Sequence, residues 1–264
     1  MKQRVITAVI ALAIFIPILL AGGVWLEIAA AVLASIGIFE IYIMRKRIIV
    51  SMDFLITILG TLAIAVPLNF YKGWLPDSFT RLDVFYVFAV LLLLITVFSK
   101  NKFNFEDVGV SVVSMIYIGT GFHYLASVRN SSGGFALLMY ALIVVWSTDI
   151  FAYQFGRKIG KHKLWPAISP NKTWEGTIGG VVSALVLSGI YVYFVPQAYS
   201  LTTMLMISFV LSAFGQLGDL IESAYKRFYK VKDSGNILPG HGGILDRFDS
   251  MLIVLPLLHI FGLV

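Results

Sequence analysis

Residues 202–225 read T-T-M-L-M-I-S-F-V-L-S-A-F-G-Q-L-G-D-L-I-E-S-A-Y, an apolar run long enough to cross a bilayer as a helix. It nevertheless carries two carboxylates near its end. Asp219, Glu222 and Ser223 are spaced i, i+3 and i+4, so they share one helical face, and Lys226 follows on that face at i+7. If the helix leaves the hydrocarbon at Lys226, Asp219 lies about 10 Å deeper. A carboxylate at that depth needs a cation, a proton or hydrogen-bond donors, which makes this face a candidate functional site.

The rest of the chain has the same apolar character. Hydrophobic residues make up 59% of the sequence, charged residues 13%, and the mean hydropathy is +0.89. We therefore expect an all-α, polytopic integral membrane protein. We predict about nine transmembrane helices, at residues 4–21, 24–44, 49–70, 83–98, 108–128, 135–155, 176–196, 202–225 and 246–263. No linker divides the chain, so we expect a single membrane domain over 1–264, in which 1–130 is an N-terminal scaffold and 135–264 carries the catalytic spans and loops.

The basic residues predict the orientation of these spans. With the N-terminus in the cytoplasm, only Lys72, Arg81 and Arg129 of the 20 Lys and Arg residues fall on the opposite side. This is a strong positive-inside bias, and it explains the high pI better than binding to nucleic acid does. We expect a multi-pass protein of the cell's inner (cytoplasmic) membrane, surrounded by membrane lipids, with no nucleic-acid partner. Glu40 lies within a predicted span, and the Arg45–Arg47 turn is its candidate partner.

The last predicted span opens with Asp246-Arg247-Phe248-Asp249. Asp246 can be a helix N-cap, and Asp249 can favour the helix N-terminus electrostatically. Because one loop joins this span to the antiparallel span before it, Asp246 can also converge with Asp219 near the cytoplasmic interface. Converging carboxylates share a proton or bind a divalent ion. With many cations nearby, a Mg²⁺–phosphate site is the economical interpretation, although Glu222 can simply pair with Lys226 at i,i+4.

The loop between the two spans supplies positive charge and flexible backbone. Pro239-Gly240-His241-Gly242-Gly243 predicts a stiff turn followed by backbone whose N–H groups can face phosphate oxygens. It is not a P-loop, because G-x-x-x-x-G-K-[ST] is absent. His241 taken alone can be an ordinary loop histidine. The cations that can neutralise a polyphosphate here are Lys226, Arg227, Lys230 and Lys232.

A second polar segment runs from Trp146 to Gly176. Asp149 has no cation nearby in sequence, so it must find its partner on another helix. Ser169-Pro170 is typical of an N-cap followed by proline in the first helical position, which predicts the start of the seventh span. The residues that would then surround this helix N-terminus, where the dipole favours anions, are Asn171, Lys172, Thr173 and Glu175.

The segment Ser223–Asp249, S-A-Y-K-R-x4-K-D-x-G-x2-L-P-x-H-G-G-I-x-D-R-F-D, resembles the signature of the phosphatidate cytidylyltransferases, also called CDP-diacylglycerol synthases. It departs from the family pattern at Tyr225, where an aliphatic residue or phenylalanine is usual; the change is conservative. G-D-L-x-E-S and S-P-N-K-T-x-E-G, earlier in the chain, also resemble the family. The resemblance implies that a phosphatidic acid oxygen attacks the α-phosphorus of CTP, giving CDP-diacylglycerol and pyrophosphate, with Mg²⁺ required. Separately from the resemblance, this many oxygen ligands are compatible with a second cation.

The resemblance also implies roles for individual residues. Asp219 and Asp246 would be metal ligands, with Glu222 and Asp249 as additional candidates. His241, Gly242 and Gly243 would contact phosphates. The residues implied to hold the triphosphate or the phosphatidate headgroup are Lys226, Arg227, Lys232 and Arg247, and those implied to bind the nucleotide or lipid phosphate are Ser223, Asn171, Lys172 and Thr173.

Two other functions compete with this one. A CTP-using polyprenol kinase would transfer the γ-phosphate to a lipid alcohol and release CDP. A cation-coupled transporter would use Asp149, Asp219 and Asp246 to bind its ion, but such proteins often contain inverted repeats, and none is visible here. The D-x2-D-G-x2-A-R pattern of CDP-alcohol phosphotransferases is absent, and the lack of cysteine excludes a thiolate nucleophile. A homodimer is a further hypothesis.

Overall fold

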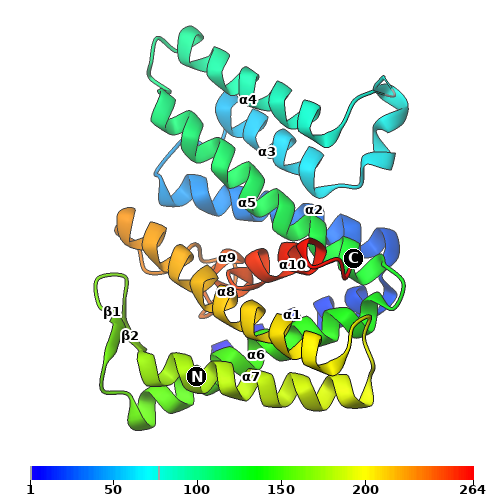
Figure 1. Cartoon of the computed structure of the whole chain (residues 1–264). Coiled ribbons are helices and arrows are strands. Elements are labelled where there is room, and N and C mark those ends of the chain that lie inside the picture. The colour runs from blue at the N-terminus through cyan, green and yellow to red at the C-terminus, as the bar shows by residue number, and fades with distance from the viewer. Residues whose placement is uncertain (1, 77) are drawn as a thin grey trace. The chain divides into compact units, whose positions relative to one another are not determined.

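The computed structural model describes residues 2–76 and 78–264, and within α1 it leaves out the side chains of residues 2–5 and 8. Met1 and the side chains of Lys2 and Arg4, which enter the topology prediction, lie outside the described part. The chain forms two compact units, whose elements are labelled in Figure 1. The first contains Met1–Ala126 and Asp233–Leu245; the second contains Ser127–Lys232 and Asp246–Val264.

The first unit is helical. In it, α3 packs against both α2 and α4, and α1 contacts α2. Tyr42 of α2 is fully buried and shares a hydrogen bond with Thr57 of α3 at 3.0 Å. The helices are α1 (Lys2–Ala21), α2 (Gly23–Met44), α3 (Met52–Ala65), α4 (Arg81–Phe98) and α5 (Phe105–Asn130), with the 3-10 turns η1 (Leu68–Phe70) and η2 (Lys72–Trp74) between α3 and α4.

The second unit is built on α6 (Gly134–Ile159), α7 (Trp174–Phe194) and α8 (Leu201–Phe228), which pack against one another. Small residues allow α6 and α7 to approach closely, since a Cβ added to Gly180 would lie 2.7 Å from the Thr148 carbonyl oxygen. α9 (Leu245–Phe248) and α10 (Met251–Ile260) end the chain.

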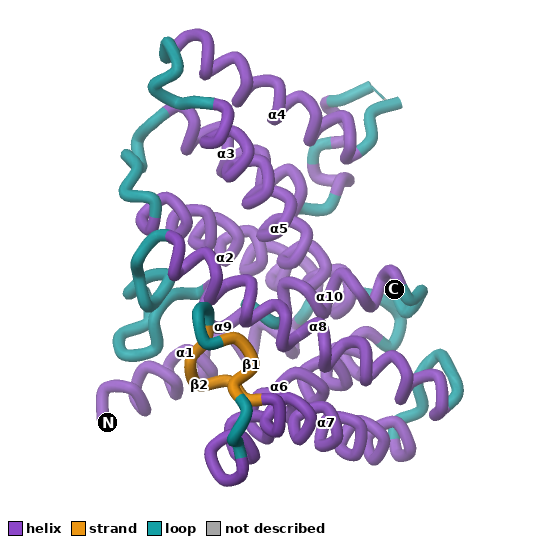
Figure 2. Tube along the Cα trace, turned by 60° about the vertical axis from the view of Figure 1, so that its left-hand side comes forward, coloured by secondary structure: helices purple, strands orange, loops and turns teal. Residues whose placement is uncertain are grey.

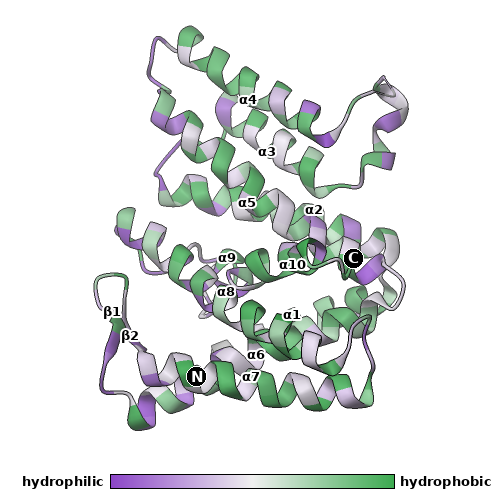
Figure 3. Ribbon diagram, viewed as in Figure 1, coloured by the Kyte–Doolittle hydropathy of each residue, from purple (hydrophilic) through white to green (hydrophobic). Residues whose placement is uncertain are grey.

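The helices confirm an all-α membrane protein at the level of fold class. Among the described residues, six helices are long and apolar enough to cross a bilayer: α2, α4, α5, α6, α7 and α8. The other three predicted spans coincide with the shorter apolar helices Val9–Ala21, Met52–Ala65 and Met251–Ile260. Figure 3 shows hydrophobic residues over most helical surfaces, with hydrophilic residues concentrated in the connecting segments.

Two predicted spans have different limits in the structure. The span predicted over 49–70 ends as a helix at Ala65, because Pro67 disfavours a helical Val66, whose ψ is 144°. The span predicted over 246–263 is interrupted at Asp249 and Ser250, between α9 and α10. Ser250 donates its hydroxyl to the carbonyl of Gly215 at 2.9 Å, which ties this interruption to α8.

The span predicted over 176–196 forms α7 (Trp174–Phe194), but the predicted cap at Ser169-Pro170 is wrong. Ser169–Thr173 forms strand β2, which pairs antiparallel with β1 (Lys163–Trp165) in the small hairpin of Figure 2. Thr173, rather than Ser169, caps α7, because its hydroxyl accepts a hydrogen bond from the Gly176 amide at 3.2 Å. Asn171 and Lys172 therefore lie in an extended strand immediately before the helix.

One ion-pair network fixes the turn after α2. Asp107 pairs with Arg45 at 2.6 Å and also with Arg47. Asp107 additionally accepts a hydrogen bond from the Asn104 amide at 3.0 Å. The Arg45 side chain is only 5% exposed, so its charge depends on this carboxylate.

We expect Asp107→Asn to lower the free energy of unfolding by about 2 kcal/mol, because it leaves the buried Arg45 charge uncompensated. Thermal unfolding of detergent-solubilised protein, followed by tryptophan fluorescence, measures the loss. Glu106→Gln, at an exposed neighbouring position, is the matched control and should change stability by less than about 0.5 kcal/mol. Equal stability of the two variants would contradict the prediction.

Candidate functional site

The carboxylate-bearing face of α8 meets α9 through Lys226. Its ammonium group lies 2.8 Å from Glu222 and 2.6 Å from Asp246. These side chains are 11%, 1% and 5% exposed. The alternative suggested by the sequence, an i,i+4 pair between Glu222 and Lys226, is therefore present, and the same lysine also holds Asp246.

A second lysine pairs with the carboxylate nearest the N-terminal end of this face. Lys172, at the end of the hairpin, pairs with Asp219 at 2.7 Å and donates to the Gln216 carbonyl at 3.3 Å. Ser223 donates its hydroxyl to Asp219 at 3.3 Å. The structure thus brings together Asp219, Ser223 and Lys172, three residues that the sequence placed in one site from two distant segments.

Asp149 of α6 and Asp249 join this group. The charges of Asp219 and Asp249 act on Asp149, together with that of Lys172. Asp249 also interacts electrostatically with Asp219 and Lys226, so it links the two lysine-centred pairs. Asp149 was absent from the residues predicted for the site. Its intramembrane charge marked it in the sequence, but its partners are distant along the chain.

The other residues predicted for the second unit take different positions. Arg227 donates to two backbone carbonyls, those of Ile168 at 3.3 Å and Val231 at 3.0 Å, so it braces the hairpin. Thr173 is buried as the cap of α7. Asn171, Lys232 and Arg247 are exposed, where a ligand from solvent can reach them.

His241, Gly242 and Gly243 lie in the first unit. The predicted turn is confirmed: the His241 amide donates to the Leu238 carbonyl at 2.8 Å, and Gly240 has φ +79°. Pro239 and a left-handed Gly240 are the residues that a type II turn requires at its two central positions. The Leu238 amide donates a hydrogen bond to the Gly242 carbonyl at 3.0 Å, and this bond closes a small loop.

The chain is similar to known proteins along its whole length. The model of the cytidylyltransferase family matches residues 2–264. A phosphatidate cytidylyltransferase of Staphylococcus saprophyticus is 47% identical over 260 residues, covering 98% of each chain. One of Bacillus subtilis is 46% identical over 261 residues, covering 98% of this chain and 96% of that protein.

The chain belongs to the cytidylyltransferase family. Family membership therefore rests on the whole chain, including the N-terminal spans, which carry no signature residues. The resemblance inferred from Ser223–Asp249 is confirmed.

The donor set of this family member suits a divalent cation. Five carboxylates interact around only two lysines, and oxygen is the donor that Mg²⁺ prefers. Glu222 Oε1 is buried and has no hydrogen-bond partner among the described residues. Within the described part, no three acidic or histidine side chains stand in a metal-binding arrangement. A bound cation would compete with Lys172 and Lys226 for carboxylate oxygens, so the four ligands named from the sequence stay a prediction. The five carboxylates are Asp149, Asp219, Glu222, Asp246 and Asp249.

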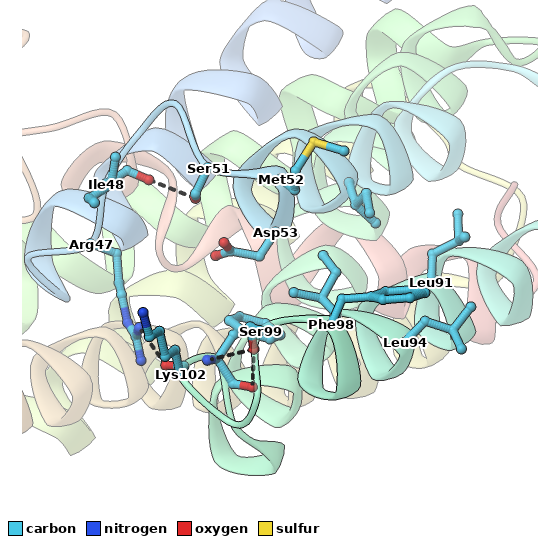
Figure 4. A pocket seen from close by; sticks show the side chains of 13 residues that line it. Arg47, Ile48, Ser51, Met52, Asp53, Leu91, Leu94, Phe98, Ser99 and Lys102 are labelled. Carbon is cyan, nitrogen blue, oxygen red and sulfur yellow. Dashed lines mark hydrogen bonds between the residues drawn. The ribbon is translucent and has the colours of Figure 1, made fainter.

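A cavity lies apart from this charged cluster. It is in the first unit, has a volume of about 630 Å³, and is lined mainly by α3, α4 and the turns beside them (Figure 4). Asp53 is its single acidic lining residue, beside Arg47 and Lys102. One carboxylate among mostly apolar side chains offers no metal or triphosphate site, so the charged cluster of the second unit is the better candidate.

We expect Lys226→Met to lower the free energy of unfolding by about 3 kcal/mol, because Glu222 and Asp246 lose their shared cation while buried. Adding Glu222→Gln should restore part of that loss by removing one uncompensated charge. Unfolding followed by tryptophan fluorescence measures both variants. Lys158→Met, at an exposed position at the end of α6, is the matched control. Equal losses in the single and double variants would contradict the shared role of Lys226.

Proposed function

We propose that this protein transfers CMP from CTP to phosphatidic acid, giving CDP-diacylglycerol and pyrophosphate for phospholipid synthesis. Support comes from the family match over residues 2–264 and from relatives of nearly equal length named phosphatidate cytidylyltransferase. The single observation that carries the proposal is the charged cluster in which Lys226 pairs with the buried Glu222 and Asp246, and Lys172 pairs with the partly exposed Asp219.

The chemistry joins two polyanions, so positioning and charge neutralisation should supply most of the rate enhancement. A bound Mg²⁺ would supply charge neutralisation at the phosphate oxygens. We propose that Asp219 and Asp246 hold it, with Glu222 and Asp249 as additional ligands, and we add Asp149 to the site. Lys172 and Lys226 would neutralise charge on the substrate phosphates in this proposal.

We propose the following roles for the remaining predicted residues. Ser223 and Thr173 would orient the nucleotide or lipid phosphate. Gly242 and Gly243 would offer backbone N–H groups to phosphates, with His241 beside them. The exposed or half-exposed residues that we propose to meet CTP from solvent are Asn171, Arg227, Lys232 and Arg247. A homodimer, a second cation and a single membrane domain stay predictions.

We expect purified protein with Mg²⁺ to move label from α-labelled CTP into lipid in the presence of phosphatidic acid, with pyrophosphate released and EDTA blocking both. Asp219→Asn and Asp246→Asn should lower kcat at least 100-fold, about 2.7 kcal/mol. Asp83→Asn, in the capping box of α4, is the matched control and should keep normal turnover. Label recovered as soluble CDP, with a phosphorylated lipid alcohol, would identify a kinase instead.

We further propose nine spans in the inner membrane, with the N-terminus and the charged site on the cytoplasmic side. The lack of cysteine allows a direct test with single cysteines. In right-side-out vesicles, a membrane-impermeant maleimide should label Ser132→Cys and spare Lys100→Cys; inverted vesicles should reverse the result. Labelling of both variants from the same side would overturn the proposed orientation.

A further inference from the structure

A buried glutamate in the first unit contacts both ends of the loop 234–245, which lies within the segment Ser223–Asp249. Glu40 of α2 is 0% exposed. Its carboxylate accepts hydrogen bonds from the Ser234 hydroxyl at 2.9 Å and from the Ile244 and Leu245 amides at 2.7 and 2.9 Å. Ser234 lies near the start of the loop, and Ile244 and Leu245 form its end. One side chain therefore holds together the two ends of a loop of about ten residues. These hydrogen bonds offset the conformational entropy that the loop loses when its ends are fixed.

Packing around the carboxylate shows that the contact is built into the loop. A Cβ on Gly235 would lie 2.9 Å from Glu40 Oε1, and a Cβ on Gly243 would overlap Glu40 and Ser234. On the same face of α2, one turn away, a Cβ on Gly37 would lie 3.1 Å from the Leu245 side chain. Glycine at these positions lets the loop approach the helix closely.

The position of this contact connects it to the proposed chemistry. α9 begins at Leu245, and the next residue is Asp246, a proposed metal ligand. The carboxylate of Glu40 accepts a hydrogen bond from the first backbone amide of α9, that of Leu245. Between the two anchored ends lies the turn that carries His241, Gly242 and Gly243.

We propose that Glu40 is a positioning residue for the reaction: its buried carboxylate fixes both ends of the loop 234–245 and thereby sets the backbone from which Asp246 and the His241-Gly242-Gly243 turn project. Glu40 itself touches no substrate in this proposal. The inference rests on the proposed function for its kinetic consequence, while the anchoring itself can be measured without activity.

The test compares Glu40→Gln with wild type in detergent. A glutamine keeps the size of the side chain but turns an N–H group towards backbone donors, so one amide loses its acceptor. We expect the amides of Ile244 and Leu245 to exchange hydrogen at least tenfold faster, kcat to fall at least tenfold, and the Mg²⁺ concentration for half-maximal rate to rise at least fivefold. Glu27→Gln, in the same helix about 20 Å away, is the matched control.

The half-saturating Mg²⁺ concentration separates positioning from simple loss of folded protein, because a smaller active fraction lowers the rate without changing that concentration. Faster exchange with wild-type kinetics would overturn the positioning role. Wild-type exchange at residues 244–245 would overturn the anchor itself. If the wild-type protein makes no lipid-linked CMP, the proposed function fails, whereas the exchange comparison still tests the anchor.

Ser234→Ala covers the case in which Glu40→Gln does not fold. It removes one of the three hydrogen bonds and leaves the carboxylate in place. We expect a smaller change in the same direction, about twofold to fivefold in exchange and in the Mg²⁺ requirement. Where both variants fold, their effects should be non-additive, because they break the same contact. Full additivity, or a Ser234→Ala protein identical to wild type, would count against the anchor.

Discussion

The ammonium group of Lys226, held between Glu222 and Asp246, is the contact on which the second unit depends. Both carboxylates are almost fully buried, at 1% and 5% side-chain exposure. Neither can stay charged among apolar helices without a cation. The lysine also joins α8 to α9 across the loop between them, and the Ser250–Gly215 hydrogen bond adds a second tie between α8 and the last part of the chain. Lys172, at the end of the β1–β2 hairpin, forms a similar ion pair with Asp219.

Much of this site follows from helical spacing alone. Asp219, Glu222 and Lys226 share a face because they lie at i, i+3 and i+7, and the structure keeps that relation. The start of α7 did not follow, because Ser169-Pro170 matches a local helix signal that strand pairing overrides. The end of the chain was also misjudged. At the break, Ser250 forms a hydrogen bond to Gly215, a residue 35 positions earlier. A hydropathy pattern cannot predict a contact of this kind.

Asp149 and Glu40 show why partners of intramembrane charges escape prediction. Each stands out in the sequence as a carboxylate in an apolar helix, yet the charged groups that act on Asp149 and the donors that bind Glu40 are distant along the chain. Glu40 contacts residues about 200 positions later, and its donors include two backbone amides, which have no side-chain signature. Sequence can therefore flag such residues as important, but only packing reveals what they do.

The two kinds of partner imply different behaviour of the carboxylates they satisfy. A lysine ammonium can be replaced by another cation, since both offer positive charge to the same oxygens, and its long side chain can swing away. Backbone amides at the start of a helix cannot be exchanged in this way without unwinding it. Carboxylates held by Lys172 and Lys226 are accordingly suited to change partners when ligands arrive, whereas Glu40, held by Ile244 and Leu245, is suited to stay fixed. An enzyme that assembles two polyanions needs both properties, an adaptable charged cluster and a rigid loop beside it in sequence.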